Sequence, residues 1–168
     1  MSTNLMSDSY ELPTDYLYEI GRIVVSWSKL ESLILHTSVI ALLGEFSKDG
    51  RALAVLTHMA FPQRLDALSS MLRIIDENLA EVYIQQVQGL LRQSQDKRNA
   101  ALHQEWIAEE DGVKRLNIKA RGTLKLTLHP VSIQELIDVS QFIDEAHTQL
   151  IRLVTIPLSS KLEPQHGQ

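Results

Sequence analysis

Apolar residues recur at steps of three and four along the first quarter of the chain and predict a long helix over residues 14–43. The apolar stripe consists of Tyr16, Ile20, Ile23, Trp27, Leu30, Ile34 and Ala41. Gly44 follows as a typical helix stop, and Lys48-Asp49-Gly50 indicates a turn. We expect residues 1–13 to form a flexible N-terminus ahead of this helix.

The next apolar stretches predict three further helices. A short helix covers about 51–60. A second has Pro62 in its first turn, where proline is favoured, and then presents one apolar face formed by Leu65, Leu68, Leu72 and Ile75. The third is expected to begin at Asn78, with Glu81 three residues later as in a capping box, and to continue towards Trp106.

After the fourth helix the apolar spacing becomes alternating, which predicts a β-hairpin over about 113–129 with one apolar face. A two-residue turn would place Ile118 opposite Lys125, a mismatch of apolar and charged side chains. A three-residue loop at 121–123 is therefore favoured. It pairs apolar residues with one another, Ile118 with Leu126 and Leu116 with Leu128.

The last helix has the strongest start signal. Ser132 and Glu135 form a capping box, and Val131 and Leu136 are placed for a hydrophobic staple. We expect this helix to run to about 155 and to end at Pro157, followed by a disordered tail over 158–168.

These segments predict a mainly α fold. Four long helices and one short helix form a bundle over 14–157, with a β-hairpin inserted before the last helix. The 168 residues suffice for one domain with a core and are few for two.

Composition and charge exclude several kinds of functional site. The net charge of −5 argues against a protein that coats nucleic acid by bulk charge, although local contacts to phosphate stay open. The absence of cysteine excludes a disulfide framework, a thiol nucleophile and thiolate zinc sites, and we expect no metal and no cofactor. The start lacks the pattern of a signal peptide, and the most apolar run, 32–43, is too short to span a bilayer, so we expect a cytoplasmic protein without a membrane contact.

One polar cluster interrupts the inward stripe of the fourth helix. The stripe projects by helical spacing onto Arg98, and an arginine there is costly unless it is paired or faces a second surface. Asn99 and His103 share a neighbouring face, with Gln95 one turn earlier. A histidine transfers protons near neutral pH, and a guanidinium binds phosphoryl oxygens. Alternatively, Arg98 pairs with Glu31 or another carboxylate and His103 interacts with the helix dipole, while Glu31 also stays open as a supporting residue.

The segment Asp96-Lys97-Arg98-Asn99-Ala100-Ala101-Leu102-His103 resembles the R-x4–6-H motif of the HEPN superfamily, in which a polar residue often follows the arginine. HEPN domains are compact helical bundles with this motif on a late helix, which is the layout predicted here. The resemblance implies metal-independent RNA cleavage with Arg98, Asn99 and His103 as the catalytic residues, usually in a homodimer that brings two motifs into one cleft. It also implies a toxin or defence component that an antitoxin or regulatory protein holds in check.

Basic residues concentrate from 92 to 125, where eight Lys or Arg and five acids give +3 against −8 for the remainder. The candidate RNA-binding residues in the predicted hairpin are Arg115, Lys119, Arg121 and Lys125. In the favoured register Lys119 lies opposite Lys125, a repulsive pair unless an anion lies between them. The alternative is an edge hairpin that lysines keep soluble.

Functions of different classes therefore stay open. The first is an endoribonuclease in which a ribose 2′-hydroxyl attacks the adjacent phosphorus and leaves a 2′,3′-cyclic phosphate. The second is a non-catalytic helical dimer that binds RNA, a nucleotide or a protein partner, which the acidic overall charge and the short motif favour. A purely structural bundle would bury Arg98 in an ion pair within the chain.

Overall fold

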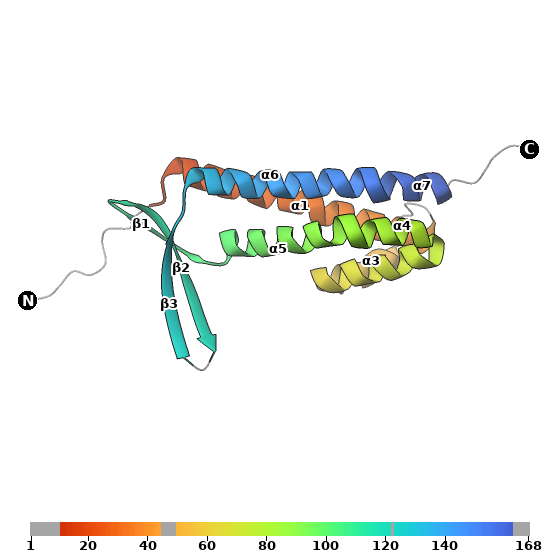
Figure 1. The fold of residues 1–168 in the computed structure, drawn as a ribbon, viewed down its shortest axis with the longest axis horizontal. Coiled ribbons are helices and arrows are strands. Elements are labelled where there is room, and N and C mark those ends of the chain that lie inside the picture. The colour runs from red at the N-terminus through yellow and green to blue at the C-terminus, as the bar shows by residue number, and fades with distance from the viewer. Residues whose placement is uncertain (1–10, 45–49, 122, 163–168) are drawn as a thin grey trace, which may run out of the picture.

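The computed structural model describes residues 11–44, 50–121 and 123–162, and the side chains of 119–124 lie outside the described part. Figure 1 shows a bundle of long helices with a small sheet at one end, so the fold is mainly α, as predicted. The helices are α1 (Thr14–Leu43), α2 (Gly50–His58), α3 (Phe61–Ile75), α4 (Glu77–Val82), α5 (Gly89–Leu102), α6 (Ile133–Leu150) and α7 (Ile156–Leu162). The strands are β1 (Glu105–Glu109), β2 (Gly112–Arg121) and β3 (Thr123–Pro130), and two π-helical turns cover Tyr83–Gln88 and Ile151–Thr155.

Helix α1 confirms the prediction for the first segment. It ends at Gly44, whose φ of 78° is a left-handed conformation that glycine adopts without a steric cost, and the Gly44 N–H donates to the carbonyl of Ile40. Its inward residues pack in the central core, where Ile23, Leu30 and Ile34 are fully buried. The burial of this stripe explains why the helix forms.

The helix that leads to the motif starts earlier than predicted. Asp76, not Asn78, is the cap: it is extended, and its carboxylate accepts the N–H of Leu79 at 2.9 Å. From Glu77 the chain is helical through a π-helical turn and α5 to Leu102. It does not reach Trp106, because His103 leaves the helical conformation with φ −109° and ψ 8°.

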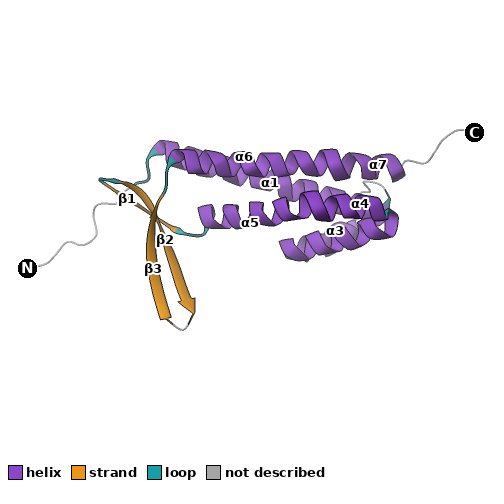
Figure 2. Ribbon diagram, in the orientation of Figure 1, coloured by secondary structure: helices purple, strands orange, loops and turns teal. Residues whose placement is uncertain are grey.

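The inserted segment is a three-stranded antiparallel sheet in the order β1-β2-β3, drawn in orange in Figure 2, where a hairpin was predicted. The predicted register of β2 and β3 is confirmed, with Ile118 opposite Leu126 and Leu116 opposite Leu128. Strand β1 was missed because its three central residues, Trp106-Ile107-Ala108, are apolar without alternation. The β2–β3 ribbon projects from the bundle (Figure 1), and Ile118, Leu126 and Leu128 on its apolar face are exposed.

The last helix begins as predicted but does not end at Pro157. The Ser132 hydroxyl accepts the N–H of Glu135 at 3.2 Å. Beyond Leu150 a π-helical turn leads into α7, and the N–H of Ile156 reaches back to the carbonyl of Ile151. This wider turn relieves the clash that a proline ring makes in a regular α-helix, so the helix continues through Pro157. The predicted tail is thus helical as far as Leu162, and Leu158 is fully buried.

By length and composition α1 is also apolar enough to cross a membrane, and 44% of its most apolar window is buried inside the bundle. The core helix of a folded domain has the same property, so this feature is weak evidence for a membrane span. In Figure 1, α1 lies beside α6 along the length of the bundle. This packing accounts for the apolar composition of α1.

Candidate functional site

The three motif residues meet at the C-terminal end of α5. The Nη1 atom of Arg98 lies 2.9 Å from Oδ1 of Asn99 and 2.8 Å from Nε2 of His103. A guanidinium only donates hydrogen bonds, so Nε2 of His103 acts as the acceptor and the ring proton lies on Nδ1. The structure therefore joins the arginine, the amide and a neutral imidazole in one hydrogen-bonded group.

Arg98 lies against an aromatic pair. Its guanidinium carbon is 5.5 Å from the ring centre of Trp27, which packs on Phe61 at 4.7 Å between ring centres. Trp27 is nearly buried, so it is a core residue, as expected, and it also supports Arg98. The Nε atom of Arg98 is buried and has no hydrogen-bond partner among the described residues. The Nε atom of Arg115 is likewise buried without a partner among the described residues, and each of these two unsatisfied donors costs free energy.

Two side chains from the sheet bind the last carbonyls of α5. The Arg115 guanidinium donates to the carbonyl of Ala100 at 3.1 Å, and the Trp106 indole N–H donates to that of Ala101 at 3.0 Å. These groups lack helical partners at a helix C-terminus. The backbone N–H of His103 donates to the carbonyl of Asn99 at 3.0 Å. Trp106 and Arg115 thus fix the backbone that carries the motif.

Arg115 and Trp106 also contact the other helices of the bundle. Arg115 forms an ion pair with Glu135 in the first turn of α6. Its guanidinium lies 5.7 Å from the ring of Trp106, which contacts Tyr16 edge-on. The Tyr16 hydroxyl donates to the carbonyl of Val131 at 2.8 Å, and burial raises the pKa of this phenol, so it stays protonated. Helices α1, α5 and α6 therefore hold the site together.

The two residues predicted to support the motif differ in where the structure places them. The carboxylate of Glu31 lies 3.8 Å from the guanidinium of Arg64 on α3, so it is Arg64 that Glu31 pairs with and not Arg98. The ion pair within the chain that the structural alternative requires is not found for Arg98 among the described residues. Gln95 is partly buried one turn before Asn99, in a place where it can support the motif.

The predicted RNA-binding residues are not equivalent in the structure. Arg115 is held by Ala100 and Glu135, so it joins sheet to bundle and is not free to bind phosphate. Lys125 is exposed, and its backbone pairs with that of Lys119, as predicted. The side chains of Lys119 and Arg121 lie outside the described part. Of the two side chains of this set that the structure describes, that of Lys125 is exposed and that of Arg115 is held in contacts.

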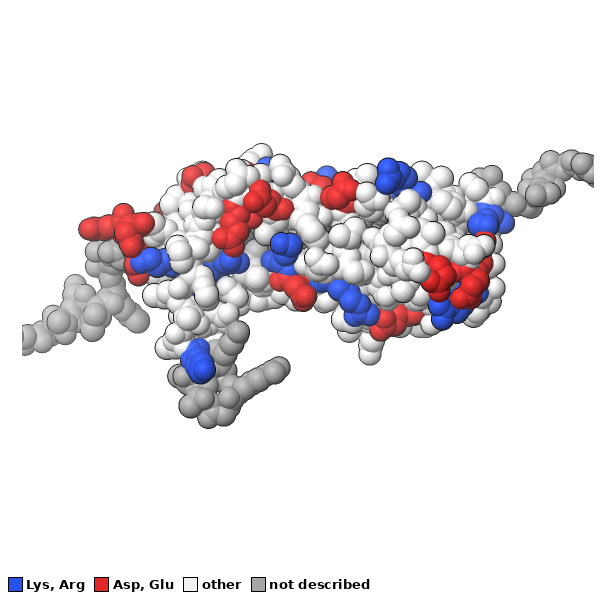
Figure 3. Space-filling model, viewed as in Figure 1, with Lys and Arg blue, Asp and Glu red and all other residues white. Residues whose placement is uncertain are grey.

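Ion pairs engage two of the basic side chains of residues 92–125 that lie outside the motif. Lys114 lies 2.5 Å from Glu109 and 3.0 Å from Asp111, and Arg92 lies 2.6 Å from Asp66. In the view of Figure 3, basic and acidic side chains are interspersed over the described surface and form no extensive basic patch.

Comparison with protein-family models, curated proteins and solved structures found no match to this chain. The described residues include no group of three or more His, Asp or Glu side chains arranged to hold a metal ion.

Sequence reasoning missed the contribution of three residues to the site. Tyr16 and Trp106 were assigned only to elements, and Glu135 only to a cap. Tyr16 and Glu135 act through contacts between different elements of the fold, Tyr16 with Val131 and Glu135 with Arg115. The one local signal was an indole placed three residues after His103, where it reaches back to the end of its own helix.

Proposed function

We propose that the protein is a metal-independent endoribonuclease of HEPN type, with Arg98, Asn99 and His103 as its catalytic residues. The observation that carries the proposal is the position of Nη1 of Arg98 between Asn99 and His103. This contact holds a phosphate-binding cation within hydrogen-bond reach of a neutral base, and His103 is exposed to solvent.

The reaction needs only these groups and RNA. His103 accepts the proton of a ribose 2′-hydroxyl while the 2′-oxygen forms a bond to phosphorus. The bond from phosphorus to the 5′-oxygen breaks, which leaves a 2′,3′-cyclic phosphate on one product and a 5′-hydroxyl on the other. Arg98 turns its donors from His103 to the phosphoryl oxygens, frees Nε2 and stabilises the charge of the transition state. Asn99 orients the imidazole or contacts the phosphate.

The leaving 5′-oxygen takes up a proton, and one motif contains one histidine. In this proposal the histidine of a second copy of the chain supplies it, so the active form is a homodimer. An enzyme that cleaves RNA in the cytoplasm without a cofactor needs restraint. We therefore include a toxin or defence role, with an antitoxin or regulatory protein as the restraining partner.

The test compares wild type, His103→Ala and His58→Ala on end-labelled single-stranded RNA in EDTA. His58 is also exposed and lies on α2, outside the motif, so it controls for loss of a surface histidine. The proposal expects cleavage by wild type and His58→Ala, with cyclic phosphate ends, and none by His103→Ala. Cleavage by His103→Ala at the wild-type rate, or cleavage that EDTA stops, would contradict the proposed site.

A second candidate is a non-catalytic helical dimer that binds RNA, a nucleotide or a protein. The net charge of −5 favours it, because an acidic chain provides no long-range attraction for RNA. In that case no variant cleaves RNA, and His103→Ala retains binding. Arg98→Ala weakens binding because the guanidinium contact is lost.

A further inference from the structure

One face of the projecting β2–β3 ribbon is apolar and exposed to solvent (Figure 1). Ile118 is 56% exposed, Leu126 58% and Leu128 48%. Residues opposite each other in a sheet share a face, and the register pairs the two leucines of β3 with two apolar residues of β2. We define the ribbon face as Leu116, Ile118, Leu126 and Leu128. Exposed apolar residues that gather on one face mark a contact surface.

Strand β3 is also an open edge of the sheet. The strand order is β1-β2-β3, and no other described strand pairs with the far side of β3. The N–H of Val131 donates to the carbonyl of Val113 at 2.9 Å, which extends the β2–β3 register by one hydrogen-bonded pair. Hydrogen-bonded pairs alternate along an antiparallel ladder. The backbone groups of Thr127 therefore point to β2, whereas those of Leu126 and Leu128 point outwards.

Pro130 agrees with this assignment. It lies opposite Lys114 at a position where the backbone nitrogen points outwards, so its missing N–H removes no hydrogen bond to β2. The open edge thus presents the N–H and C=O groups of Leu126 and Leu128 beside their own exposed side chains. An extended segment that pairs there gains backbone hydrogen bonds and apolar contacts together.

The charge of the ribbon indicates which segment fits. Residues 112–134 contain five of the 16 Lys and Arg of the chain and none of its 21 Asp and Glu. Carboxylates from outside this range pair with Lys114 and Arg115. Lys125 is exposed on the polar face and has no ion pair among the described residues, and the register places it opposite Lys119. An acidic partner would relieve this repulsion between like charges.

We propose that the open edge of β3 binds an extended segment of another protein, in which apolar and acidic side chains alternate. The segment adds to the sheet as a fourth strand, antiparallel to β3. Its apolar residues lie opposite Leu126 and Leu128 and extend the ribbon face. Its acidic residues lie opposite Lys125 and Thr127 on the polar face. Backbone hydrogen bonds provide affinity, and the alternation of side chains provides specificity.

Two other occupants fit these observations less well. A second copy of this chain would bring two ribbons together, each with five bases and no acid over residues 112–134, so like charges would meet. RNA would use the cations, because phosphates contact Lys and Arg. It would leave the ribbon face and the outward backbone groups of Leu126 and Leu128 uncovered.

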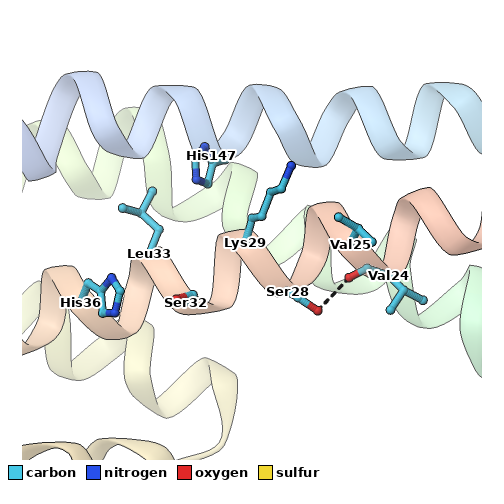
Figure 4. Close-up of a pocket in the computed structure, with 8 residues that line it drawn as sticks. All are labelled: Val24, Val25, Ser28, Lys29, Ser32, Leu33, His36 and His147. Atoms are coloured by element: carbon cyan, nitrogen blue, oxygen red, sulfur yellow. Dashed lines mark hydrogen bonds between the residues drawn. The ribbon is translucent and has the colours of Figure 1, made fainter.

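Exposed apolar residues on α1 do not offer the same kind of contact. Val24 and Val25 line a hollow of about 530 Å³, where Lys29 extends from α1 towards α6 and His147 (Figure 4). Backbone groups within a helix are bonded to one another, so this surface presents side chains alone. The edge of β3 adds directional backbone groups, which give a bound segment a defined register.

The first test uses a synthetic seven-residue peptide in which valine and glutamate alternate, with valine at both ends, at a concentration where it does not self-associate. Fluorescence anisotropy measures its binding to the full chain. N-methylation of the two inner valines removes the N–H groups that donate to Leu126 and Leu128, and is expected to weaken binding at least about 10-fold. Methylation of the two outer glutamates, whose N–H groups point away from β3, is the control and should change binding less than about 2-fold. No binding by the unmodified peptide, or equal weakening by both methylations, would overturn the proposal.

The second test changes the protein. Leu126→Thr keeps a residue that favours strands but removes apolar contact, and is expected to weaken binding about 5-fold or more. Ile74→Thr makes a similar change at a site on α3 that is 86% exposed, and should bind as wild type does. Lys125→Glu should bind the glutamate peptide more weakly than wild type, and a peptide with lysine in place of glutamate more tightly. Equal binding by Leu126→Thr and Ile74→Thr, or a preference for glutamate that Lys125→Glu retains, would contradict the proposed contacts.

The third test locates the bound peptide by amide hydrogen exchange, measured by NMR. In the free protein the N–H of Thr127 should exchange slowly, because it is bonded to β2, and those of Leu126 and Leu128 should exchange fast. Saturating peptide should slow exchange at Leu126 and Leu128 at least about 10-fold. A peptide that binds without this protection lies elsewhere, and the proposal would then be wrong.

The other occupants would give different results. A species of twice the 19.0 kDa of one chain in light scattering, which Leu126→Thr dissociates, would show that a second copy covers the ribbon face. Single-stranded oligouridine that binds wild type but not Lys125→Glu, with no binding by the peptide, would show a nucleic-acid surface. Either result would overturn the proposal. These measurements do not involve RNA cleavage, so this proposal and the proposed function can fail separately.

Discussion

Arg98 and His103 contact each other across the last turn of α5, with 2.8 Å between Nη1 of the arginine and Nε2 of the histidine. The same Nη1 also lies 2.9 Å from Oδ1 of Asn99. One side chain therefore contacts an amide and an imidazole while its guanidinium carbon lies 5.5 Å from the ring centre of Trp27. This combination requires a planar group with several donors in a fixed arrangement, which arginine has and lysine lacks.

Replacing Arg98 with lysine tests that requirement. An ammonium cannot hold two partners in the same plane or bind a phosphate through two parallel hydrogen bonds. If the chain is the proposed ribonuclease, we expect Arg98→Lys to reduce the rate of RNA cleavage by about 100-fold or more, as for the loss of one transition-state donor. The measurement is single-turnover cleavage of labelled RNA in EDTA. Arg73→Lys makes the same change on the exposed surface of α3 and is the control, which should cleave normally. An undiminished rate in Arg98→Lys would show that a positive charge suffices.

Replacing Arg115 tests the connection between sheet and bundle. Arg115→Met keeps an apolar side chain near Trp106 but removes the hydrogen bond to Ala100 and the ion pair with Glu135. We expect the free energy of unfolding in urea to fall by about 1–3 kcal/mol, since hydrogen bonds from a charged donor are lost. The exposed Lys125→Met should change it by less than about 0.5 kcal/mol. Equal stability of the two variants would mean that these contacts do not fix the end of α5.

Structural features that depend on residues close together in the chain could be predicted from the sequence. The stop at Gly44, the cap at Ser132 and the pairing of Ile118 with Leu126 follow from local geometry, and all three are found. Spacing along one helix was likewise enough to expect Arg98 and His103 on adjoining faces. Contacts between distant segments were not predictable in this way. Arg115 was expected to bind phosphate because nothing in its neighbourhood shows that α6 brings Glu135 to it.

Local rules also failed where the wider structure changed the backbone. Proline normally ends a helix because its ring clashes with a carbonyl four residues earlier. At Pro157 the preceding π-helical turn moves that carbonyl away, and the pairing of Asp76 with Lys161 joins α7 to the start of α4. Neither feature leaves a pattern in the spacing of apolar residues, so the sequence predicted a tail where the structure has a packed helix.

The Asp76–Lys161 ion pair makes stability depend on pH in a defined direction. The Lys161 ammonium and the N–H of Leu79 hold the pKa of the Asp76 carboxyl below its ordinary value of 3.8. The folded form therefore gains stability from ionised Asp76 above pH 3.8 and loses it as the pH falls through the lower pKa of the fold. Asp76→Asn keeps a helix cap but removes the charge. We expect its melting temperature to lie below that of wild type at pH 7.

The difference between the two melting temperatures should shrink as the pH falls below 3.8, because wild type then also loses the charge. The measurement is thermal unfolding by circular dichroism from pH 7 downward, with Lys161→Met as the control background. In that background Asp76→Asn should have a smaller effect at pH 7. A gap that stays constant with pH would show that the carboxylate charge does not act through Lys161.

The helix beyond Pro157 supplies the last prediction. Leu158 is fully buried in the central core, whereas Ile156, two residues earlier on the same helix, is 58% exposed. Leu158→Ala should lower the free energy of unfolding in urea by about 2–5 kcal/mol, because it removes buried methyl groups and leaves a cavity. Ile156→Ala removes similar atoms from the surface and should cost less than about 1 kcal/mol. If both variants unfold at the same urea concentration as wild type, α7 is not packed on the core and the chain ends its fold at Pro157.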